Sequence, residues 1–106
     1  MWEQIFQIVR EAIEEFNAIY KQNIPIELGE EAPLYGGSGV LDSLGLVSLI
    51  VMIEQSIEDE LGVPVILADE KAMSQKNSPF LNVHLLVVYI VGIIEEEKAA
   101  WSNPSP

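Results

Sequence analysis

The sequence predicts a small all-α fold, a four-helix bundle with a long loop between the first two helices and a short third helix. Two observations indicate this class. Long segments place apolar residues three and four positions apart, which is the period of an amphipathic helix. The chain has 106 residues, 49% of them hydrophobic, so it matches one domain with a modest core. We expect that domain to span residues 1–98 and residues 99–106 to form a disordered tail.

The first helix is predicted from Trp2 to about Tyr20, with its aromatic side chains in the core. Its apolar positions recur at helical spacing and are Trp2, Ile5, Phe6, Val9, Ala12, Ile13, Phe16, Ile19 and Tyr20. The periodicity stops at Lys21, and the segment up to Val40 contains two prolines and four glycines, so it is predicted as a loop. A structureless loop of about twenty residues is unusual in a compact domain, so we expect it to be functional or to contain a short element.

The second helix is predicted from Asp42 to Leu61 and has two different faces. A broad apolar face should lie in the core and comprises Leu46, Leu49, Ile50, Ile53, Ile57 and Leu61. The other face is apolar in its N-terminal half and acidic in its C-terminal half, and comprises Leu44, Val47, Ser48, Val51, Glu54, Gln55 and Glu58. Gly62 is expected to end the helix, and Pro64 prevents its resumption.

Two further helices are predicted in the C-terminal part. Asp69 can cap a single turn over Glu70–Met73, and Ser78 followed by Pro79 is a helix start signal for a last helix from Phe80 to about Lys98. The last helix is apolar almost all round and cannot face one core. Either the long loop folds back through Leu34 and Tyr35 to cover it, or it presents an apolar stripe for a partner, for self-association or for an acyl-chain cavity. Its apolar run of about fifteen residues is too short for a membrane span.

Net charge restricts the class of partner. Seventeen acidic residues against five basic ones give a formal charge of −12, which would repel nucleic acid and anionic membranes and attract basic protein surfaces. The chain has no cysteine, which excludes disulfides and thiolate chemistry, and its N-terminus has no signal-peptide pattern. We therefore expect a cytoplasmic, monomeric protein.

Ser43, in the stretch "GSGVLDSLGL", allows three interpretations: a helix cap, a nucleophile or an attachment point. Asp42 is itself a good N-cap residue, which leaves the Ser43 hydroxyl free at the positive end of a helix. The stretch lacks the first glycine of a nucleophile elbow, and His84 is the chain's single histidine, so a small serine hydrolase lacks a base. No metal-ligand or P-loop spacing is present. We therefore predict no catalytic residue, no metal and no enzymatic activity.

Asp42-Ser43-Leu44 at the start of such a helix resembles the attachment motif of acyl carrier proteins. The resemblance extends over roughly residues 2–95, through the order of the helices, the Val/Pro-containing turn after the second helix and Tyr89-Ile90 in the last helix. It implies a fold of the acyl-carrier-protein type and 4′-phosphopantetheine attached to Ser43 between Asp42 and Leu44. A phosphopantetheinyl transferase would transfer this group from coenzyme A.

The resemblance further implies a carrier that holds acyl groups as thioesters for enzymes of fatty acid, lipid or related acyl biosynthesis. Its partners would be acyl-loading and acyl-transfer enzymes with basic surfaces. The residues expected to bind them are Val47, Val51, Glu54, Glu58, Asp59 and Glu60. Gly45 and Ser48 stand where carriers of fatty acid synthesis often have acids, which favours a specialised carrier. Two alternatives stay open: an unmodified acidic interaction module, and an aminoacyl or peptidyl carrier.

Overall fold

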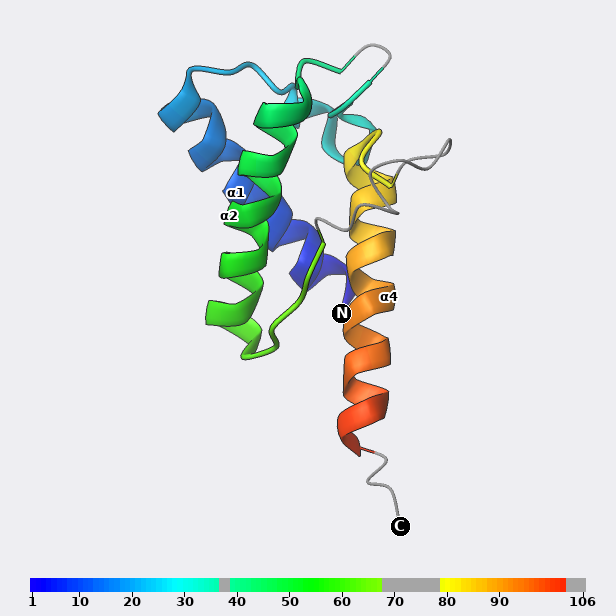
Figure 1. Ribbon diagram of the computed structural model, residues 1–106. Helices are drawn as coiled ribbons and strands as arrows, with labels where there is room; N and C mark the ends of the chain where they lie inside the picture. The colour runs from blue at the N-terminus through cyan, green and yellow to red at the C-terminus, as the bar shows by residue number, and fades with distance from the viewer. Residues whose placement is uncertain (37–38, 68–78, 103–106) are drawn as a thin grey trace.

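Three long helices, α1 (Trp2–Tyr20), α2 (Ser43–Leu61) and α4 (Val83–Ser102), dominate the computed structural model, which describes residues 1–36, 39–67 and 79–102 (Figure 1). A short 3-10 helix, η1 (Ile26–Glu31), interrupts the connection between α1 and α2. Helix α1 packs against both α2 and α4. The predicted all-α bundle is confirmed. The short helix expected at Glu70–Met73 lies outside the described residues.

Helix α1 has the predicted bounds and ends at Tyr20, followed by Lys21 as its C-cap in the left-handed conformation with φ of 54°. Its buried side chains follow the predicted spacing and are Ile5, Ile8, Val9, Ala12, Ile13 and Phe16. Of the aromatic side chains predicted to lie in the core, Phe16 is buried and Trp2 and Phe6 are partly buried, whereas the prediction was wrong for Tyr20, which is exposed.

The long connection contains a short element, as the sequence predicts, and it is tied to the body at both ends. Near its start, the Asn17 side-chain amide donates to the Ile24 carbonyl at 3.1 Å and its oxygen accepts the Ile24 N–H at 3.1 Å. Near its end, the chain runs antiparallel to the segment before α4, where the Leu34 N–H donates to the Leu81 carbonyl at 2.9 Å. Leu34 is fully buried as a result.

Helix α4 begins at Val83 and not at Phe80, where the prolyl start signal placed it. The Phe80 and Leu81 carbonyls accept hydrogen bonds from the α1–α2 connection, and Asn82 caps the helix by accepting the Leu85 N–H at 2.8 Å. These bonds hold the preceding residues in an extended bridge, which moves the start to the next capping residue. The helix continues to Ser102, so the tail expected from residue 99 is helical up to there.

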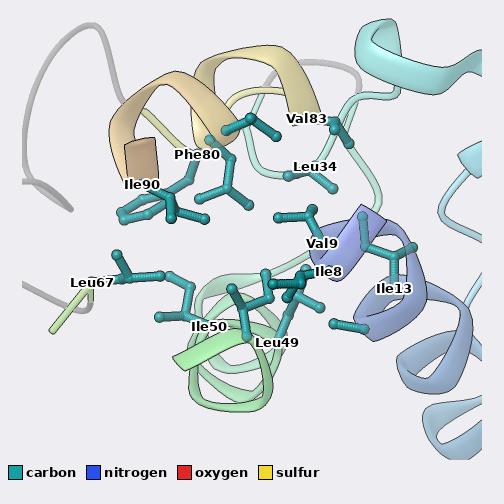
Figure 2. Packing of buried hydrophobic residues seen from close by; sticks show 14 of the residues in the cluster. Ile8, Val9, Ile13, Leu34, Leu49, Ile50, Leu67, Phe80, Val83 and Ile90 are labelled. Carbon is teal, nitrogen blue, oxygen red and sulfur yellow. The ribbon is translucent and has the colours of Figure 1, made fainter. Parts of the chain in front are cut away.

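One apolar cluster joins all the described elements (Figure 2). Figure 2 shows Leu67 reaching into the same core as Ile50 of α2 and Ile90 of α4, while Leu34 and Phe80 fill it from the connections. The predicted core face of α2 is buried, except that Leu61 is only half-buried. The core therefore fixes α2 by one face and leaves the opposite face available.

The connection covers only the first part of the apolar surface of α4. Leu85 and Val88 stay exposed, and Val88 borders an open groove with Pro64, Ile66, Tyr89 and Ile93. The prediction that the long loop covers the last helix is thus confirmed for the residues before and at the start of α4. It is wrong for the outer face of α4, where Leu85 and Val88 are exposed. Within the described ranges, no helix combines the length and the apolar character that crossing a membrane requires.

Candidate functional site

Asp42 and Ser43 mark the start of α2. Asp42 has extended backbone angles, its Oδ1 accepts the Gly45 N–H at 2.7 Å, and its carbonyl accepts the Leu46 N–H at 2.9 Å. Asp42 is therefore the N-cap, as the sequence predicts. Ser43 is the first helical residue, its side chain is exposed, and capping makes no demand on its hydroxyl.

The Ser43 hydroxyl has one neighbour that the sequence did not indicate. The Tyr35 hydroxyl lies 3.2 Å from Ser43 Oγ, eight positions earlier in the chain, and either oxygen can donate. The sequence suggested Tyr35 only as a residue that could cover the last helix. No periodicity links the two positions, because the turn between them brings them together.

Backbone contacts hold together the described residues on the two sides of that turn. The Leu41 N–H donates to the Leu34 carbonyl at 3.0 Å, and Tyr35 and Leu41 form a parallel bridge. A Cβ atom on Gly39 would clash with the Leu34 carbonyl oxygen, and glycine avoids this clash because it has no Cβ atom. The Tyr35 N–H donates to the Phe80 carbonyl at 3.1 Å. Tyr35 is thereby anchored to the segment that precedes α4 while its hydroxyl reaches the start of α2.

The outer face of α2 presents an apolar strip directly after Ser43. We define this strip as Leu44, Val47 and Val51, whose exposed fractions are 76%, 37% and 40%. Their spacing places them on one side of the helix, and the core holds the opposite side. Val47 and Val51, which the sequence assigned to partner contact, and Leu44 of the attachment motif are therefore accessible, as partner binding would require.

The acidic residues of α2 do not form one uniform group. Glu58, Asp59 and Glu60 are exposed. Glu54 is half-buried, and its Oε2 accepts the Leu67 N–H at 2.6 Å. Glu54 thus fastens the chain after α2 to the helix, which is a structural contact that the sequence did not reveal. Ser48 is also engaged locally, because its hydroxyl donates to the Leu44 carbonyl at 3.1 Å.

The possible metal ligands and the histidine of the described residues were weighed in the sequence as candidates for chemistry. The described ranges contain no group of three or more His, Asp or Glu side chains arranged to hold a metal ion. The imidazole of His84 contacts Glu30, with Nδ1 at 2.9 Å from Oε1, and its ring lies 5.3 Å from the Trp2 ring. His84 therefore ties α4 to η1 and α1.

Comparison with known proteins identifies the family. The chain is 36% identical over 70 residues to a D-alanyl carrier protein of Bacillus mycoides (strain KBAB4), an alignment that covers 66% of this chain and 77% of the relative. The chain belongs to the phosphopantetheine-binding carrier protein family. No protein-family model and no solved structure matches this carrier protein. Its cofactor is 4′-phosphopantetheine, and a carrier is not itself a catalyst.

Proposed function

We propose that this protein carries an aminoacyl group, with D-alanyl as the first candidate, on 4′-phosphopantetheine attached to Ser43. The observation that carries the proposal is the Ser43 hydroxyl. It is exposed, Asp42 releases it from capping, and it opens a long helix in a member of a carrier family. The chain has no cysteine and therefore no thiol of its own. The terminal thiol of the phosphopantetheine arm would hold the cargo as a thioester.

The residues around Ser43 fit this group. A phosphodiester carries negative charge, and the first turn of a helix offers amide groups without intrahelical carbonyl partners together with the positive end of the macrodipole. Asp42 orients that turn through its bond to Gly45, and the exposed Leu44 flanks the attachment point. The arm would leave from a rigid helix start into solvent, where a partner enzyme can receive it.

The outer face of α2 would bind the partners. Leu44, Val47 and Val51 offer apolar contacts beside the arm, and Glu58, Asp59 and Glu60 attract basic surfaces. The partners are a phosphopantetheinyl transferase and enzymes that load and unload the cargo, which we place in the cytoplasm. Glu54 contributes mainly by holding the helix to the following chain, because its carboxylate already accepts the Leu67 N–H.

An aminoacyl cargo is favoured over a fatty acyl one by two observations. The relative is named for a D-alanyl cargo. In addition, Gly45 and Ser48 occupy positions where carriers of fatty acid synthesis often have acids, and Ser48 bonds to its own helix. The N-terminal half of the outer face is therefore apolar, which points to partners that differ from those of fatty acid synthesis.

The attachment is tested by intact-protein mass spectrometry after incubation with coenzyme A and a broad-specificity phosphopantetheinyl transferase. We expect the protein to gain one phosphopantetheine group and the Ser43→Ala variant to gain none. Because Ser43 is exposed and does not cap the helix, the variant should fold, which circular dichroism can verify. An unmodified protein would leave an acidic interaction module without an arm.

The cargo is tested on the holo protein. We expect a D-alanine-activating ligase with ATP to add one D-alanyl group that neutral hydroxylamine removes, as it does from thioesters. In the competing assay, an acyl–acyl carrier protein synthetase is supplied with ATP and a long-chain fatty acid. Efficient fatty acylation without D-alanylation would assign the protein to fatty acyl transfer instead.

A further inference from the structure

The contact between Tyr35 and Ser43 has no role in the function proposed above. We propose that Tyr35 is a positioning residue for the modification of Ser43: its hydroxyl orients Ser43 Oγ before the transfer and donates a hydrogen bond to the phosphodiester afterwards. This inference rests on the proposed function, because it requires Ser43 to be the attachment site. It starts from the 3.2 Å distance between the two hydroxyl oxygens.

Tyr35 is held in place before any partner arrives. Its ring is half-buried against the core, and its N–H is bonded to Phe80 at the segment before α4. The bridge to Leu41 and the close approach of Gly39 hold Tyr35 beside the residues that lead into Ser43. Because the phenol is already ordered, its hydrogen bond to Ser43 requires little further loss of conformational entropy.

After modification, only one of the two hydroxyl oxygens of Tyr35 and Ser43 still carries a proton, and this decides which of them donates the hydrogen bond. In the transfer, Ser43 Oγ forms a bond to the phosphorus of coenzyme A that bears pantetheine. The pyrophosphate P–O bond breaks, adenosine 3′,5′-bisphosphate leaves with its electron pair, and the serine proton passes to a base of the transferase. Ser43 Oγ is then an ester oxygen without a proton. Of the two oxygens, only the Tyr35 hydroxyl can still donate.

Asp42, the other side chain at this helix start, cannot supply such a donor. A carboxylate only accepts hydrogen bonds, and Asp42 Oδ1 already accepts the Gly45 N–H. The negative charge of Asp42 also opposes a neighbouring phosphate. A neutral phenol at 3.2 Å from Oγ therefore provides a side-chain donor that the Asp-Ser-Leu motif by itself lacks.

The test compares Tyr35→Phe, which keeps the ring and removes the hydroxyl, with Tyr20→Phe, which makes the same change at an exposed tyrosine whose ring lies 4.8 Å from that of Phe16. Steady-state transferase assays give kcat and KM for each apo protein, and the ³¹P spectrum of each holo protein reports the phosphodiester. For Tyr35→Phe we expect about a fivefold fall in kcat, the size of one net hydrogen bond. Its KM should be unchanged and its ³¹P resonance shifted, and Tyr20→Phe should match the wild type in all three.

The outcomes separate this inference from the function on which it rests. If the wild type gains no phosphopantetheine, both are wrong. If the wild type and Tyr35→Phe are modified with equal kcat and show the same ³¹P resonance, only the role of Tyr35 is overturned. A rise in KM or a loss of thermal stability in Tyr35→Phe would likewise overturn it, since the hydroxyl would then serve docking or folding.

Discussion

Asp42 contributes a cap and a charge at the start of α2, and two substitutions separate these contributions. Asp42→Ala should lower the free energy of unfolding by about 1 kcal/mol, because the Gly45 N–H loses its acceptor. Asp42→Asn should stay near the wild-type stability, since asparagine caps equally well. Urea unfolding measures both. Equal destabilisation of the two variants would show that the carboxylate charge, and not the capping bond, stabilises the helix.

Gly39 is required by the close approach of two backbone segments. In Gly39→Ala the new methyl group would meet the Leu34 oxygen and, at 2.8 Å, the Tyr35 nitrogen, so the turn must shift. We expect a loss of about 1–3 kcal/mol in thermal or urea unfolding. Gly92→Ala is the matched control, because its methyl group meets nothing within 4 Å and a helical alanine should add about 0.5–1 kcal/mol. A neutral Gly39→Ala would mean that the turn is not fixed as described.

Helix α2 carries two kinds of acidic residue: Glu54 makes a structural hydrogen bond, whereas Glu58 is exposed to solvent. Glu54→Ala should lower the free energy of unfolding by about 1.5–3 kcal/mol, because the partly buried Leu67 N–H loses a charged acceptor. Glu58→Ala, at an exposed position, should change it by less than about 0.5 kcal/mol. Equilibrium unfolding of both variants provides the comparison. Similar values for the two would return Glu54 to the group of purely solvated acids.

Helices α1 and α2 could be predicted from the sequence, whereas the start of α4 could not. In α1 and α2 the apolar period, the Asp42 cap and the Gly62 stop are local signals, and the observed bounds follow them. At α4 the local proline signal competes with hydrogen bonds from Leu34 and Tyr35, which lie far away in sequence. The long-range bridge prevails, because an extended segment that pairs with another chain cannot also be helical.

At the scale of the whole molecule, the charge of −12 governs the encounter with basic partners. The second-order rate of modification by the transferase should fall as salt is raised, since the screening length shrinks from about 10 Å at 0.1 M to about 3 Å at 1 M. The variant Glu58→Gln/Asp59→Asn/Glu60→Gln should be slower at low salt and less dependent on it. A rate that salt does not change would mean that the apolar strip alone controls docking.

Helices α1 and α2, the acidic character and the position of Ser43 after its capping aspartate can all be predicted from local sequence patterns. These features depend on periodicity, composition and hydrogen bonds between near neighbours. The tertiary structure alone decided which apolar residues of α4 are covered, that Glu54 binds the Leu67 N–H and that Tyr35 meets Ser43. Each of these contacts joins segments whose distance in space depends on how the connections between helices fold back, and no local pattern encodes that distance.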